Sequence, residues 1–128
     1  MTTFLVVGFL FVHGLLHLAV WLPHPDPRPE HPAPFEPDHS RVLTAVHVEQ
    51  QTTHRVAVVL AVATAAVYVV SALAVWIGLP SAAAIVGLAA VIGLAMKVLY
   101  FDPWLLIGIG LDALVLTSAV VGWPVTLT

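Results

Sequence analysis

Apolar residues run along the chain in four long stretches. A helix needs about 20 consecutive apolar residues to cross the hydrocarbon core of a bilayer. The stretches of this length lie at residues 3–22, 56–79, 81–101 and 103–121. They predict an all-α protein, an integral membrane four-helix transmembrane bundle that forms a single domain over residues 1–128.

Turn and capping residues separate the later spans. Residues 78–81 read Gly-Leu-Pro-Ser, which predicts the end of one helix and the start of the next, with Ser81 at its N-cap. Asp102 is an N-cap residue followed by Pro103 at the first helical position, where the missing N–H costs nothing. Tryptophan favours the lipid–water interface, and each of the four falls near the end of a span: Trp21, Trp76, Trp104 and Trp123.

The connection at residues 23–40 differs from the rest of the chain. It holds seven of the ten prolines and alternates them with histidine and charged residues. Such a segment favours extended polyproline II, so it predicts one long Pro/His-rich loop between the first two spans. Residues 40–55 have a helical pattern that Ser40 could cap. Both an amphipathic surface helix and an extension of the second span fit that pattern.

The amino-acid composition adds one point to this picture, namely which solvent surrounds the helices. Hydrophobic residues make up 60% of the chain and charged residues 9%, with a mean hydropathy of +1.02. A soluble domain carries about 25% charged residues, so the partner of this surface is a lipid bilayer. The chain has no basic excess, which argues against a nucleic-acid partner. It has no cysteine, which excludes disulfides and thiolate metal sites.

The basic residues predict an orientation in the membrane. All four belong to the side of the long loop: Arg28, Arg41, Arg55 and Lys97. Because basic loops stay on the inner side, the loop is predicted to be cytoplasmic, and both termini lie outside.

Ionisable groups inside the spans are costly, so their depth is informative. At about 1.5 Å per residue, His13 and Asp112 both lie ~12–13 Å from the loop-side end of their helices. His17 and Lys97 both lie ~6 Å from it. These levels predict a polar column that opens toward the loop side. Asp112 is then a proton or cation acceptor, or a buried partner of His13.

His13 and His17 are spaced i, i+4 and project from one face of a helix. This spacing suits two ligands of one zinc, copper or iron ion. A proton or quinone site and purely structural hydrogen bonds between helices are the alternatives. In the catalytic interpretation His13, His17 and Asp112 form the reacting group, and Asp112 relays a proton.

Other polar residues have less demanding roles. His47, Glu49 and His54 cluster at the loop side and would guard the entrance to a bound cofactor, with Tyr68 deeper in the second span. Lys97 is predicted to be an interfacial anchor, because its long stem can reach the headgroups. Hydroxyl groups on one face of the second span are expected to bond neighbouring helices: Thr64, Tyr68 and Ser71.

The first span carries the sequence Phe-Val-His-Gly-Leu-Leu-His-Leu at residues 11–18. This motif resembles the first-helix signature of DoxX-like proteins, small four-helix membrane proteins of bacteria. His17 stands where that family usually has lysine, so a role that depends on that lysine does not carry over. The resemblance implies an inner-membrane protein that is accessory to a quinone-linked oxidoreductase.

Two functional hypotheses follow. The first is a membrane protein with a buried His/Asp site that binds a metal ion or a quinone for a redox or proton-linked step. The alternative is non-enzymatic, a small transporter half or an accessory subunit of a larger membrane complex. Four short spans enclose little volume, so transport would need a homo-oligomer with Asp112 near the shared axis. The sequence leaves open whether the chain is an enzyme.

Overall fold

The computed structural model describes residues 1–22 and 35–122, and every regular element in these ranges is helical. The elements are α1 (Thr2–Trp21), α2 (Arg41–Ala45), α3 (Gln50–Trp76), α4 (Ala82–Leu99), the 3-10 turn η1 (Pro103–Leu105) and α5 (Leu106–Val121). Four segments are long and apolar enough to cross a membrane: α1, α3, α4, and η1 together with α5. The predicted all-α class and the four membrane-length helices are confirmed. Most of the predicted loop, residues 23–34, and Trp123 lie outside the described residues.

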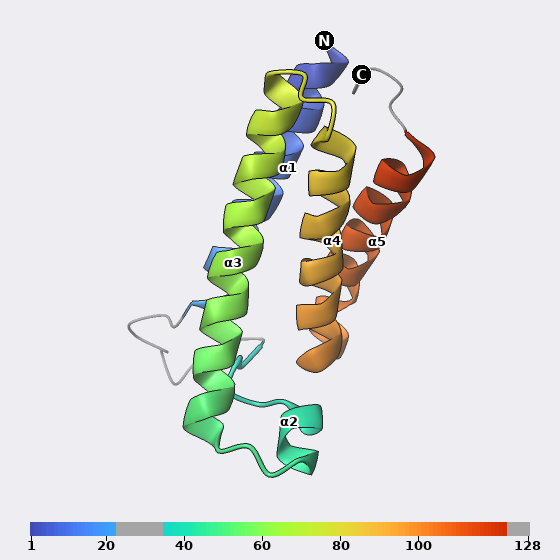
Figure 1. Cartoon of the computed structure of the whole chain (residues 1–128). Helices are drawn as coiled ribbons and strands as arrows, with labels where there is room; N and C mark the ends of the chain where they lie inside the picture. The colour runs from blue at the N-terminus through green and yellow to red at the C-terminus, as the bar shows by residue number, and fades with distance from the viewer. Residues whose placement is uncertain (23–34, 123–128) are drawn as a thin grey trace, which may run out of the picture.

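The long helices pack in a series. α1 packs on α3, α3 on α4, and α4 on α5. In Figure 1 the N-terminus of α1 lies at the same end of the bundle as the turn between α3 and α4, and α2 lies at the opposite end. The first and last helices of the series, α1 and α5, do not pack on each other in this way. They are joined instead by the buried side chains described below.

The segment before α3 combines both interpretations of residues 40–55. A short helix, α2, is followed by a turn in which His47 has a positive φ of 60°, and α3 then begins at Gln50. Ser40 caps α2 as predicted, because its Oγ accepts from the Leu43 N–H at 3.2 Å. The same hydroxyl donates to the Leu99 carbonyl at 2.6 Å and so ties α2 to the end of α4.

The predicted helix boundaries are close to the observed ones. Asp102 caps η1 through a 2.8 Å bond from the Trp104 N–H to its carboxylate. The turn between α3 and α4 contains Gly78 at a φ of 66°, a conformation that glycine adopts without steric cost. Ser81 occupies the N-cap of α4, but its side chain makes no capping hydrogen bond.

Burial is inverted relative to a soluble domain. Large apolar side chains such as Ile107 and Val120 are exposed, as expected of a surface that faces lipid. The buried polar side chains of the described residues are His13, His17, Ser40, Thr53, Thr64, Ser71, Lys97 and Asp112. Within the four apolar stretches predicted as spans, the ionisable side chains are therefore in the interior of the bundle.

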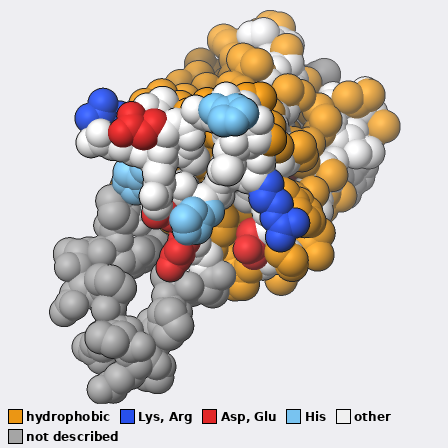
Figure 2. All heavy atoms as spheres, turned by 90° about the horizontal axis from the view of Figure 1, so that it is seen from below, with side chains coloured by type: hydrophobic (Ala, Val, Ile, Leu, Met, Phe, Trp, Pro, Cys, Tyr) orange, Lys and Arg blue, Asp and Glu red, His pale blue; other side chains and the backbone are white. Residues whose placement is uncertain are grey.

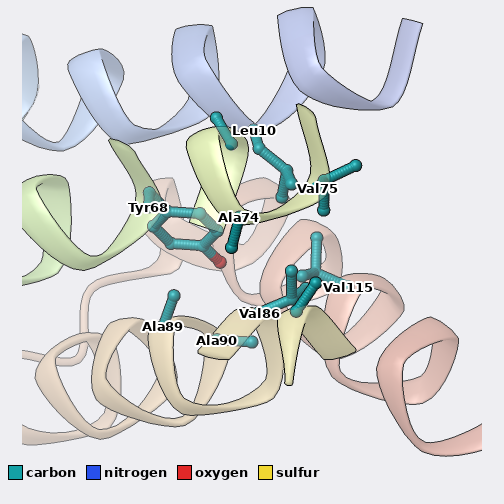
Figure 3. Close-up of a cluster of buried hydrophobic side chains, with 10 residues drawn as sticks. Leu10, Tyr68, Ala74, Val75, Val86, Ala89, Ala90 and Val115 are labelled. Atoms are coloured by element: carbon teal, nitrogen blue, oxygen red, sulfur yellow. The ribbon is translucent and has the colours of Figure 1, made fainter. Parts of the chain in front are cut away.

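Two apolar clusters fill the rest of the interior. The terminal-end cluster consists of Leu10, Tyr68, Ala72, Ala74, Val75, Ala82, Val86, Ala89, Ala90 and Val115. Figure 3 shows side chains of this cluster between the ribbons, among them Leu10, Val75, Val86 and Val115. The loop-end cluster consists of Trp21, Phe35, Ala57, Ala61, Met96, Tyr100 and Leu105. The small residues Ala57 and Ala61 are fully buried in it, which allows neighbouring helices to pack closely.

The tryptophans follow the predicted interfacial pattern only in part. Trp76 and Trp104 are about half exposed near helix ends. Trp21 is 1% exposed, because it packs edge-on against Phe35 and Tyr100 with ring centroids 4.7 and 5.3 Å away. Trp21 therefore lies at the end of its span as predicted, but its side chain packs inside the bundle and not on its surface.

Charged and histidine side chains gather at the end of the bundle that carries α2. Figure 2 views this end, with hydrophobic side chains along the flanks behind it. Arg41, Glu49 and Arg55 are exposed in this region. The bundle therefore has one polar end, as the predicted orientation requires.

We expect Ser40→Ala to lower the free energy of unfolding by about 1–2 kcal/mol, because it removes an N-cap and a buried bond to α4. Thermal unfolding of the detergent-solubilised protein, followed by circular dichroism, measures this loss. Thr44→Ala is the matched control, since Thr44 is exposed on the same helix. An equal loss in both variants would contradict the role assigned to Ser40.

Candidate functional site

The carboxylate of Asp112 is the meeting point of the four long helices. It is 0% exposed and lies on α5. Its Oδ1 accepts from His13 Nε2 on α1 and from the Tyr68 hydroxyl on α3, each at 2.7 Å. Its Oδ2 accepts from Lys97 Nζ on α4 at 2.6 Å. One side chain from every membrane-length helix thus takes part in a single network.

His17 extends this network toward the loop end. Its Nδ1 lies 2.9 Å from the His13 carbonyl oxygen, which can only accept, so Nδ1 carries the proton. In the neutral ring Nε2 is then an acceptor, and Lys97 Nζ donates to it at 2.8 Å. Lys97, only 4% exposed, therefore has two of its three donor positions satisfied. With both histidines neutral, Lys97 and Asp112 make the cluster neutral overall.

The depth argument from the sequence is confirmed by these contacts. His13 and Asp112 lie at one level, and His17 and Lys97 at another, each pair in direct contact. The prediction that Lys97 anchors the chain at the interface is wrong. The Lys97 stem extends into the bundle, where its ammonium group contacts the buried Asp112 carboxylate. This direct ion pair is more favourable than an interaction with a distant headgroup.

His13 has one nitrogen to spare. A carboxylate only accepts, so Nε2 is the nitrogen that carries the proton and donates to Asp112. Nδ1 is then a lone-pair acceptor, and it has no hydrogen-bond partner among the residues that the structure describes. The ring is held between Phe9, stacked at 5.5 Å, and Tyr68, edge-on at 4.9 Å. The result is an oriented imidazole with a free basic nitrogen.

Glycines make room for the network at three places. A Cβ at Gly93 would lie 2.5 Å from Asp112 Oδ2, and a Cβ at Gly108 would lie 2.7 Å from the stem of Lys97. A Cβ at Gly14 would lie 2.8 Å from the Cβ of Tyr68. Each contact is too short for real atoms, so a side chain at any of these positions would force its neighbour to shift.

The predicted metal ligands come together, but a cation already lies among them. Ligand atoms of His13, His17 and Asp112 lie within 4.8 Å of one another. Lys97 Nζ is within hydrogen-bond distance of both His17 and Asp112. Because ammonium and metal cations compete for the same lone pairs, a metal ion would have to displace Lys97 from the cluster.

A cavity of about 330 Å³ opens beside the network, between α1 and α5. Its polar lining comes from His13, His17 and Lys97, and Trp104 forms part of the wall. The predicted column was expected to open toward the loop side. The cavity extends toward that side as far as Trp21 and Leu105, which also belong to the loop-end cluster, and an opening to the aqueous side there stays a prediction.

The remaining candidates differ in their distance from the network, and those at the loop end lie apart from it. His47 and Glu49 are exposed, His54 is half-buried, and their role at an entrance stays a prediction. Tyr68 belongs to the network. Thr64 and Ser71, expected to bond neighbouring helices, donate to carbonyls of their own helix at 2.7 and 2.8 Å, so that expectation is wrong for these two hydroxyls. The residue whose role was missed is Lys97, although its shared depth with His17 was a usable signal.

No protein-family model, no curated protein and no solved structure matches the chain. The resemblance of residues 11–18 to DoxX-like proteins therefore stays a prediction. The case for a function depends on the geometry of the site.

We expect Gly93→Ala to lower the free energy of unfolding by about 1–3 kcal/mol, because the added methyl group overlaps the Asp112 carboxylate. Gly110→Ala is the control, since a Cβ there meets nothing within 4 Å. Unfolding by sodium dodecyl sulfate in mixed micelles measures both. A neutral Gly93→Ala variant would contradict the close approach of α4 and Asp112.

We expect Asp112→Asn to cost about 3–5 kcal/mol, because it leaves the Lys97 ammonium buried without an anionic partner. Lys97→Met removes that ammonium group, and the unbranched methionine side chain keeps the packing of the lysine stem. The double variant should therefore lose less stability than the sum of the two single variants. The same unfolding assay completes this double-mutant cycle, and additive losses would contradict a direct ion pair.

Proposed function

We propose that the chain is a multi-pass membrane protein whose His13–Asp112 pair binds the polar head of a quinone-class ligand and accepts a proton from its reduced form. The observation that carries the proposal is the buried Nδ1 of His13, an acceptor that has no partner among the described residues and belongs to a side chain that lines a cavity. A buried polar atom without a partner is rare, and a ligand that bonds it removes the cost of its burial.

The polar lining of the cavity contains one acceptor and one donor, and these match the reduced and the oxidised form of a quinone head group. His13 Nδ1 accepts a hydrogen bond from a hydroxyl group of the reduced form. Lys97 has a third N–H beyond the two that bond His17 and Asp112, and it can donate to a carbonyl oxygen of the oxidised form. If the hydroxyl proton passes to Nδ1, the resulting imidazolium lies 2.7 Å from the Asp112 carboxylate, which stabilises its charge.

A metal centre is the second candidate, supported by the mutual approach of His13, His17 and Asp112. Three ligands with an open fourth position are typical of catalytic zinc. Lys97 weakens this candidate, because its ammonium group fills the space between two of the three ligands. A metal would bind only with Lys97 neutral or moved aside.

We also propose a cellular setting, the bacterial inner membrane, with the loop side in the cytoplasm. The DoxX-like motif supports the first part. Arg28, Arg41 and Arg55 support the second. Lys97 no longer counts toward the orientation, because its charge is paired inside the bundle.

Trp104 provides a direct test, because it lines the cavity and a bound quinone quenches indole fluorescence. We expect a benzoquinone with one isoprene unit to quench the purified protein saturably in lipid nanodiscs. Its reduced form, titrated by competition, should bind His13→Phe about 10–100-fold more weakly than it binds the wild type. That range corresponds to one lost hydrogen bond to a charge-assisted acceptor.

Two controls make the result specific. Trp104→Phe should reduce the quenching to the part that Trp21, the other tryptophan in the cavity wall, contributes, and Thr117→Ala on the exposed face of α5 should leave the affinity unchanged. Equal affinities in the wild type and His13→Phe would contradict the proposal. Stoichiometric zinc in the purified protein, lost in His17→Ala, would instead favour the metal centre.

A further inference from the structure

A second cavity lies above the first along the same pair of helices. It also measures about 330 Å³. Its walls are almost entirely apolar and include Leu5 and Phe9 from α1, Val86 from α4, and Leu114 and Ser118 from α5. The polar network of Asp112 does not extend into it.

The two cavities follow each other in register. On α1 the polar cavity begins at His13 and continues toward Trp21, whereas the apolar cavity extends from Leu10 back to Thr2. At about 1.5 Å per residue, the apolar part is ~12 Å long. Both cavities lie between α1 and α5, which have few direct contacts with each other, and the His13–Asp112 bond joins the two helices at the level between the cavities. We call the two adjoining cavities together the α1–α5 seam.

The chemistry of the seam is that of an amphiphile. One end offers a buried acceptor and a buried ammonium, and the other offers only hydrocarbon. The loop-end cluster packs against the end of the polar cavity, with Trp21 and Leu105 in both. A molecule with a hydrocarbon tail dissolves in the bilayer, so the lipid is the side from which it reaches His13.

We infer that the α1–α5 seam binds one whole amphiphilic ligand, with a hydroxyl-bearing head at His13 and a hydrocarbon tail between α1 and α5. The inference rests on the proposed function for the head, and it adds the tail site and lateral entry from the bilayer. A second copy of the chain is a poorer occupant, because the exposed surfaces of its spans are apolar and would leave His13 and Lys97 at the polar end without a hydrogen-bonding partner.

The tail contributes through packing and not through transfer from water, because lipid is as apolar as the seam. The test must therefore compare protein variants at equal ligand concentration in the membrane. Benzoquinones with zero, one, two and three isoprene units are titrated in nanodiscs of one saturated lipid, with Trp104 quenching as the signal. Concentrations are expressed per lipid, so that partitioning cancels between variants.

Ser118→Phe fills the tail cavity, and Ala113→Phe places the same side chain on the exposed face of the same helix. We expect Ser118→Phe to weaken binding of the two longest-tailed quinones at least about fivefold, through lost dispersion contacts, and to leave the tailless quinone unchanged. Ala113→Phe should behave as the wild type at every tail length. Ser118→Leu, a smaller filling, gives an intermediate loss and keeps the test valid if the larger variant does not fold.

The outcomes separate the two proposals. Saturable binding at every tail length, with no difference between Ser118→Phe and Ala113→Phe, overturns the tail site and leaves the head site standing. No saturable quenching by any quinone, with or without a tail, overturns the proposed function and the seam together. A wild-type dimer that Ser118→Phe dissociates, with no effect of tail length, would assign the seam to a second copy and overturn the inference.

Discussion

One buried carboxylate fixes the arrangement of the whole bundle. Asp112 cannot remain charged inside an apolar interior without donors, and its donors come from the three other long helices. A one-residue shift of any helix would turn its donor by about 100° and leave the charge uncompensated. Rotation and depth of each helix are therefore set together. Helix association in lipid lacks a hydrophobic driving force, so this polar contact specifies what apolar packing alone would not.

The network also explains where the bundle is tight and where it is open. Gly14, Gly93 and Gly108 bring backbones close to Tyr68, Asp112 and Lys97 respectively. α1 has no such contact with α5 and is connected to it through the His13–Asp112 bond. The side of the bundle between these two helices is consequently held at one level and left hollow above and below it. The His13–Asp112 bond therefore both connects α1 to α5 and forms part of the candidate site.

Much of this arrangement could be predicted from the sequence, and the failures have physical causes. The rise of a helix is fixed, so depth alone paired His13 with Asp112 and His17 with Lys97. The direction of the Lys97 side chain could not be predicted in the same way, because its flexible stem is long enough to reach either the lipid headgroups or a buried anion. Thr64 and Ser71 were misassigned because a hydroxyl on a helix can bond a carbonyl of its own preceding turn. The packing of the loop-end cluster depends on Trp21 meeting Phe35, a contact that no local pattern encodes.

The position of Asp112 along the chain has a consequence for biosynthesis. Its three donors precede it, so a chain made from its N-terminus inserts His13, Tyr68 and Lys97 before the counterion exists. Until α5 arrives, the ammonium of Lys97 is best solvated at the membrane surface, which its long stem allows. Insertion of α5 then supplies the carboxylate to which these three donors bond.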